Sequence, residues 1–145
     1  MKKNKAFTLI ELLVVIAVLA GLMALLVPNY MDVRKKSRDV RRKSDLRSIQ
    51  KALELYKQSQ TLPIYPVAPL NTCSSLSSGG VDYMKVVPQD PLATCPNVTS
   101  AYYYVSPGDH STYILSACLE NTNDPEKVAC PGGFSCSSCY TLTEP

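Results

Sequence analysis

The residues with the widest chemical options in this sequence are its six cysteines, all in the C-terminal half: Cys73, Cys95, Cys118, Cys130, Cys136 and Cys139. An even number of cysteines in a short region with few large apolar residues is typical of disulfides formed in an oxidising compartment. Proximity in sequence favours pairing only for Cys73 and Cys95. Alternatively, Cys136 and Cys139 could form a redox dithiol, or half of a zinc site with Cys118 and Cys130. We favour structural disulfides.

One carboxylate, Glu11, interrupts an apolar run from Phe7 to Val27 that is long enough to span a bilayer as a helix. An ionised carboxylate near the membrane interior is costly unless it is paired or lies near an interface. The nearest cations are the lysines that precede the run. If those lysines are removed, the remaining candidate for a cationic partner of Glu11 is the α-ammonium of this or a neighbouring chain. Alternatively, Glu11 extends to the membrane interface from a helix end.

The helix that carries Glu11 is expected to continue beyond the membrane. Residues 29–60 are rich in Lys, Arg, Leu and Gln and lack Gly and Pro, and Leu46, Ile49, Leu53 and Tyr56 recur at spacings of three and four. This spacing predicts an amphipathic helix with a narrow apolar stripe.

Gly21 and Pro28 mark a weak segment of this long helix. Glycine loosens a helix and proline removes a backbone hydrogen-bond donor. The segment between them is therefore a candidate for local melting.

Residues 61–145 are expected to form a small head. Prolines at every third position after residue 62 predict an extended connector, and the Ser/Gly-rich stretch 71–80 predicts a surface loop. The aromatic, strand-like runs 102–105 and 111–116 flank Pro107 and Gly108. They predict an antiparallel hairpin that packs on the apolar stripe of the helix.

Charge is distributed unevenly along the chain. Residues 31–57 contain ten Lys/Arg and four Asp/Glu, whereas residues 58–145 contain two and seven. Complementary packing between subunits is the first interpretation of this asymmetry. Nucleic-acid binding through the basic helix, Arg34 to Lys51, is a weaker alternative because acidic residues are interleaved there.

The N-terminal residues from Lys5 to Ala17, KAFTLIELLVVIA, resemble the processing motif of type IV prepilins and type II secretion pseudopilins. The resemblance implies that a prepilin peptidase cuts between Ala6 and Phe7 and methylates the new amino terminus. Glu11 would be the assembly glutamate, and the segment from Gly21 to Pro28 could become extended in filaments. Ala6 departs from the usual Gly before the cut.

The head resembles that of the major type II secretion pseudopilin in the order of ten residues: Pro88, Asp90, Pro91, Tyr102, Tyr104, Pro107, Gly108, His110, Tyr113 and Ser116. In that family calcium commonly organises the following loop through oxygen ligands. The residues in the equivalent place are Glu120, Asn121, Asn123 and Asp124. The usual Gly-rich acidic pattern is missing, and Cys118 and Cys130 bracket this loop and could hold it by disulfides instead.

We therefore predict an α+β, pilin-like "lollipop": a long N-terminal transmembrane and amphipathic helix packed on a small, disulfide-stapled antiparallel β-sheet head. The expected parts are a cytoplasmic leader (1–6), a transmembrane and filament-core helix (7–28), an amphipathic helix (29–60), and a globular head with a hairpin and a Cys-rich C-terminal loop (61–145).

The predicted function is structural and not enzymatic, because no nucleophile, base and orienting group can be assembled from the sequence. The chain would polymerise into a type II secretion pseudopilus or a type IV pilus. The alternative is a membrane-anchored minor or tip module that binds a ligand. Expected partners are identical or homologous pilin subunits, the prepilin peptidase, the inner-membrane assembly platform and, before assembly, membrane lipids.

The head is expected outside the cytoplasm on a single-pass anchor, although the positive-inside rule alone would favour the opposite orientation. No cofactor is expected apart from the calcium considered above.

Overall fold

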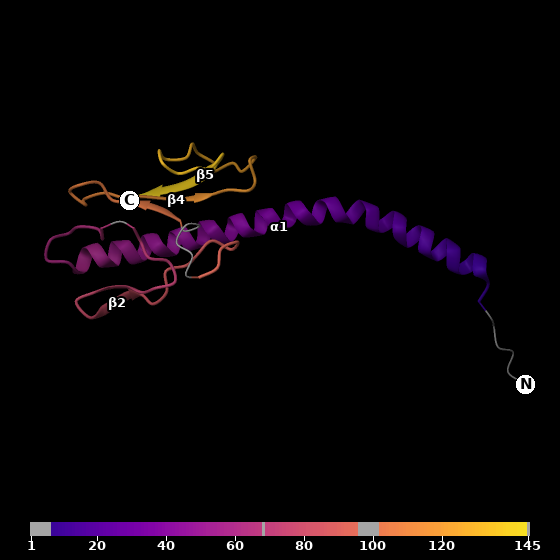
Figure 1. Ribbon diagram of the computed structural model, residues 1–145, viewed down its shortest axis with the longest axis horizontal. Helices are drawn as coiled ribbons and strands as arrows, with labels where there is room; N and C mark the ends of the chain where they lie inside the picture. The colour runs from indigo at the N-terminus through magenta and orange to yellow at the C-terminus, as the bar shows by residue number, and fades with distance from the viewer. Residues whose placement is uncertain (1–6, 68, 96–101, 145) are drawn as a thin grey trace, which may run out of the picture. The chain divides into compact units, whose positions relative to one another are not determined.

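The computed structural model describes residues 7–67, 69–95 and 102–144. The chain divides into two compact units, Met1–Lys35 and Lys36–Pro145. Helix α1, Leu9–Ser59, contributes residues to both units and is followed by short strands in the second. Figure 1 shows this order along the chain.

Local capping interactions define both ends of α1. Thr8 precedes the first helical residue, and its hydroxyl accepts a hydrogen bond from the backbone N–H of Glu11 at 3.3 Å. At the other end, the hydroxyl of Ser59 donates to the carbonyl of Tyr56 at 2.8 Å. Pro63 follows within four residues and cannot continue the helix, because it lacks an N–H.

The apolar stripe of the second unit forms the centre of the head. Leu46, Ile49 and Leu53 are almost completely buried, and Tyr56 packs against them. The tyrosines of the head complete this core, with the rings of Tyr65 and Tyr113 in edge contact at 4.6 Å between centroids. The helical spacing in the sequence thus identified the core face of this part of α1.

The main sheet has three antiparallel strands in the order β3–β4–β5. Strand β3 spans Tyr103–Val105, β4 spans Ile114–Cys118 and β5 spans Cys139–Thr143. Strands β3 and β4 form the hairpin expected around the Pro-Gly turn, with Tyr104 opposite Leu115. Strand β5 was not predicted and replaces part of the expected C-terminal loop. It pairs along the whole of β4, which is therefore the central, buried strand.

A second, two-stranded sheet corrects the prediction for residues 71–80. Strand β1, Leu76–Ser78, pairs antiparallel with β2, Val81–Met84. The residues between them, Gly79 and Gly80, have φ angles of 59° and 80°. A two-residue turn with positive φ at both positions matches the twist of a hairpin, and glycine adopts it without steric cost.

In Figure 1 the three-stranded sheet and the β1–β2 hairpin lie on opposite sides of the C-terminal part of α1. The buried cluster includes residues from the helix, from both sheets and from the connecting segments. The predicted fold class, a long helix with a small antiparallel, disulfide-bonded head, is confirmed.

Candidate functional site

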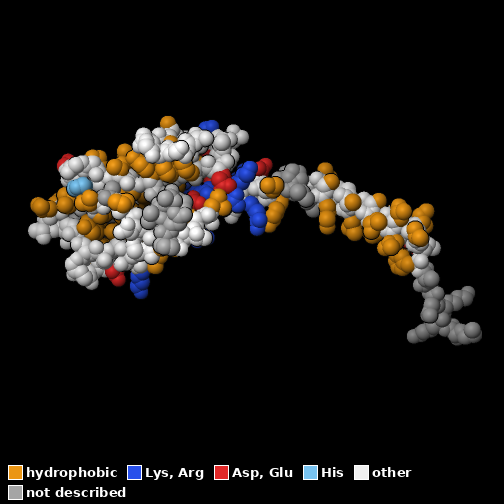
Figure 2. Space-filling model, in the orientation of Figure 1, with side chains coloured by type: hydrophobic (Ala, Val, Ile, Leu, Met, Phe, Trp, Pro, Cys, Tyr) orange, Lys and Arg blue, Asp and Glu red, His pale blue; other side chains and the backbone are white. Residues whose placement is uncertain are grey.

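The N-terminal part of α1 exposes a continuous apolar surface. Large apolar side chains from Phe7 to Leu25 are about half to four-fifths exposed. Figure 2 shows them gathered along this part of the helix. By length and composition α1 can cross a membrane. Soluble monomers rarely expose so large an apolar surface, so it needs lipid or another protein around it.

Glu11 forms a capping box with Thr8 at the start of this apolar helix. One carboxylate oxygen, Oε2, accepts hydrogen bonds from the backbone N–H of Thr8 at 2.9 Å and from its hydroxyl at 2.8 Å. The sequence pattern Thr-x-x-Glu could have identified this interaction, but sequence reasoning missed it. Among the described residues no cation pairs with Glu11, and Oε1 accepts no hydrogen bond.

Gly21 and Pro28 both lie inside α1, which is helical from Leu9 to Ser59. A Cβ atom on Gly21 would meet nothing within 4 Å. Packing within the subunit therefore does not require glycine at this position. The melting of this segment in filaments remains a prediction.

In the second unit, one buried arginine joins three carboxylates. The guanidinium of Arg42 donates to Asp90 at 2.6 and 3.1 Å, to Asp39 at 2.8 Å and to Glu120 at 2.8 Å. Arg42 and Asp39 are 2% and 1% exposed. Burial would lower the pKa of Arg42, but the hydrogen bonds that it donates to Asp90, Glu120 and Asp39 outweigh this effect and raise the pKa.

The loop after β4 is bound to the same face of α1. Arg38 donates to both oxygens of Glu120, at 2.7 and 2.5 Å. Hydrogen bonds from Arg38 and Arg42 lower the pKa of Glu120 to about 2. The carboxylate of Asp39 accepts the backbone N–H groups of Glu120 and Asn121, at 3.0 and 2.8 Å.

Lys43 completes this set of contacts between α1 and the loop. Its ammonium lies 2.6 Å from Asp124 Oδ1 and 2.7 Å from Glu126 Oε2. We name Arg38, Arg42 and Lys43 with their carboxylate partners the charged clamp. Lys/Arg and Asp/Glu side chains gather together over the middle of α1 in Figure 2.

The calcium prediction does not fit this arrangement. Of its four candidate ligands, Glu120 and Asp124 pair with cations of α1, and the side-chain oxygen of Asn121 accepts the backbone N–H of Asn123 at 3.2 Å. A calcium ion would have to share these oxygens with positively charged groups, which disfavours its binding. Asn123 alone cannot supply the ligands that calcium needs.

The nucleic-acid prediction is weakened by the same contacts. Arg38, Arg42 and Lys43 point their charges at the head's own carboxylates, and Arg47 contacts Tyr140 and Glu126. These four cations are paired with carboxylates within the head or at its surface. They do not form a basic face for a phosphate backbone.

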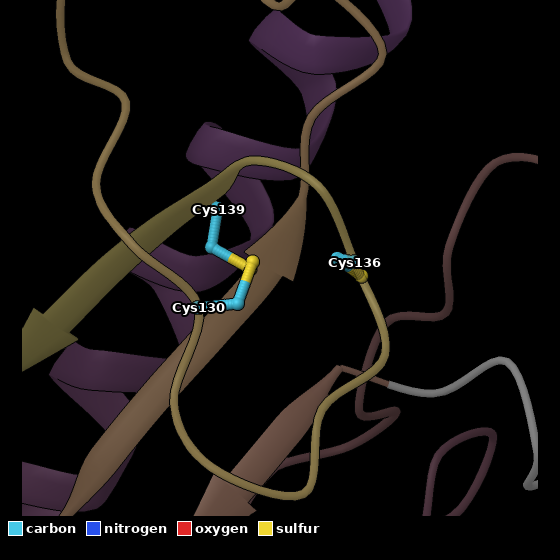
Figure 3. A group of neighbouring side chains, drawn as sticks. All are labelled: Cys130, Cys136 and Cys139. Atoms are coloured by element: carbon cyan, nitrogen blue, oxygen red, sulfur yellow. A yellow bond between two sulfur atoms is a disulfide. The ribbon is translucent and has the colours of Figure 1, made fainter.

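All six cysteines are paired in disulfides: Cys73–Cys95, Cys118–Cys136 and Cys130–Cys139. The first pair agrees with the one expected from sequence proximity. Figure 3 shows Cys130 bonded to Cys139, with Cys136 on the neighbouring loop. The dithiol and zinc interpretations are wrong for this state, because Cys136 and Cys139 have different partners and no thiolate is available for a metal.

The residues of the predicted head pattern are mainly structural contacts. The hydroxyls of Tyr102 and Tyr104 donate to Asp45 and to the carbonyl of Pro66, each at 2.7 Å. His110 is part-buried, and its Nδ1 lies 3.2 Å from the hydroxyl of Ser106. Asp90 holds Arg42, as described above.

Comparison with known proteins agrees with this geometry. Residues 1–27 match the prokaryotic N-terminal methylation motif. The chain is 32% identical to the type II secretion system core protein G of Escherichia coli K12 over 124 residues, which cover 79% of this chain and 81% of that protein. The proteins of the same name from Klebsiella pneumoniae and Vibrio cholerae are 31% and 30% identical, over 76% and 77% of this chain and 80% and 77% of theirs. No solved structure matches the chain significantly. On the identity and coverage of these relatives, the chain belongs to the family of the type II secretion system core protein G, the major pseudopilins.

Proposed function

We propose that this chain is the structural subunit of a type II secretion pseudopilus, in which apolar helices pack in the centre and heads lie outside. The observation that carries the proposal is the exposed apolar helix with Glu11 in its first turn. Similarity to core protein G supports a secretion pseudopilus over a type IV surface pilus.

Before assembly, the apolar part of α1 spans the membrane once and the head lies outside the cytoplasm. Three disulfides support this orientation, because such bridges persist in oxidising compartments. Leaving the membrane exchanges contacts with lipid for contacts with other helices. Identical or homologous subunits would be the filament partners, and an inner-membrane platform would extract the subunit.

Processing would remove residues 1–6 and leave the amino group of Phe7 next to Glu11. Ala6 lies outside the described residues. The prepilin peptidase would cut after it and methylate Phe7. A head-to-tail contact that does not close on itself then yields an open helical filament.

The intact mass of the protein from its native membrane or from shed filaments tests this proposal. The expected product lacks Met1 to Ala6, carries one added methyl group, and gains the mass of six hydrogens on reduction of its three disulfides. An uncut chain with free thiols would contradict both processing and export. The number of copies per unit length of filament tests whether it is the main subunit or a minor one.

A further inference from the structure

The cations of the charged clamp lie where carboxylates from separate segments of the head converge. Asp39 comes from α1, Asp90 from the segment after β2, and Glu120 from the loop after β4. Carboxylates that converge from separate segments repel one another unless a cation lies between them. The guanidinium of Arg42 is that cation, and all its contacts to them lie between 2.6 and 3.1 Å.

We propose that Arg42, with Arg38 and Lys43, replaces a divalent cation in this head, so that the loop from Glu120 to Glu126 folds without calcium. An arginine fork holds carboxylates in fixed directions, as an ion with oxygen ligands would. The inference does not depend on the proposed function, because it concerns only how the head is held together.

The loop's own hydrogen bonds leave few oxygens for a metal. The carboxylate of Asp124 also accepts the backbone N–H of Glu126 at 2.9 Å, and the carbonyl of Thr122 accepts the ammonium of Lys127 at 2.5 Å. The carbonyls of Asn121 and Asp124 accept backbone N–H groups at 3.2 and 3.3 Å. Three backbone carbonyls and the carboxylates of the loop are thus already engaged.

Covalent and backbone contacts fix the ends of the loop without a metal. Cys118, at the end of β4, is bonded to Cys136. Leu119 N–H donates to the carbonyl of Ser138 at 2.9 Å, and Val128 exchanges two backbone hydrogen bonds with Cys139. The cations of α1 therefore only have to hold the middle of a loop whose ends are already attached.

The test is the melting temperature of the full-length protein in detergent micelles, measured in EDTA and in millimolar calcium. The two temperatures are expected to agree within about 1 °C. A rise of several degrees in calcium, saturating with concentration, would overturn the proposal, because it would reveal a site that binds the folded state.

Substitution of the clamp provides the second measurement. Arg42→Met leaves three carboxylates without their shared partner and is expected to lower the melting temperature by about 10 °C or more. Arg41→Met is the matched control, since Arg41 is exposed and forms no ion pair among the described residues. Equal melting temperatures for the two variants would overturn the proposal. If Arg42→Met does not fold, Lys43→Met replaces it, with a smaller expected decrease and the same control.

Discussion

Arg42 and Asp90 form a bidentate ion pair between two segments 48 residues apart, with Nε 2.6 Å from Oδ2 and Nη2 3.1 Å from Oδ1. The pair attaches the segment after β2 to the helix. Its arginine is shared with Asp39 and Glu120, so the two carboxylate-bearing segments of the head are held through one side chain.

Asp90→Asn should destabilise the head without unfolding it. The substitution removes one charge from the buried pair, but Arg42 keeps two other carboxylates, so we expect a loss of about 1–3 kcal/mol. Chemical denaturation of the full-length protein in detergent measures it. Asp82→Asn is the control, because Asp82 is exposed on β2 and has no ion pair among the described residues. A loss no larger than that of the control would contradict a stabilising role for the pair.

The stability of the head should fall in acid through Glu120. The pKa of this group is about 2 in the folded protein against an ordinary value of 4.5, so between these pH values the unfolded chain binds the proton more readily. The contribution of Glu120 is therefore complete above about pH 4.5 and is lost as the pH falls towards 2. We expect about 1–3 kcal/mol, since the side chain is 23% exposed and solvent screens its pairs.

Unfolding free energies measured between pH 2 and pH 6 test this dependence. Glu120→Gln cannot ionise, so this variant should be less stable than the wild type at pH 6 and should lose less stability on acidification. Parallel pH profiles for the two proteins would show that other carboxyl groups cause the acid dependence.

The local patterns of the sequence were sufficient to predict the parts of the fold that depend on neighbouring residues. The 3.6-residue period of Leu46, Ile49 and Leu53 identified the buried face of α1, because a helix places such residues on one side. The aromatic runs on either side of Pro107 and Gly108 identified β3 and β4, because strand-forming residues that flank a turn are typical of a hairpin.

Non-local pairing was not available from one sequence. Nothing in the spacing of Arg42 and Asp90 indicates that they meet, and any of several carboxylates could have been chosen. Strand β5 was missed because the cysteine at its start was considered as a bridge or ligand, although the four residues that follow it alternate between apolar and polar, as in a strand. The capping box at Thr8 and Glu11 was local and could have been found.

Two substitutions of Glu11 should separate its capping role from its charge. Gln can still accept the hydrogen bonds from Thr8 that Glu11 accepts now, whereas Ala cannot. If a charged partner from the processed amino terminus is needed, both Glu11→Gln and Glu11→Ala will insert into the membrane but fail to form filaments. Membrane fractionation and electron microscopy of sheared filaments measure the two steps. Normal filaments from Glu11→Gln would mean that capping alone is required.

Gly21→Ala should affect the filament and not the single subunit. A methyl group at this position meets nothing within 4 Å in the subunit, and alanine favours a helix more than glycine does. Membrane insertion and the melting temperature of the head should therefore be unchanged. If the segment up to Pro28 must extend on assembly, or if another helix approaches closely at Gly21, filament yield will fall. Leu22→Ala, at the neighbouring exposed position, is the control for a change in apolar surface. Equal filament yields for Gly21→Ala and the wild type would remove Gly21 from the assembly site.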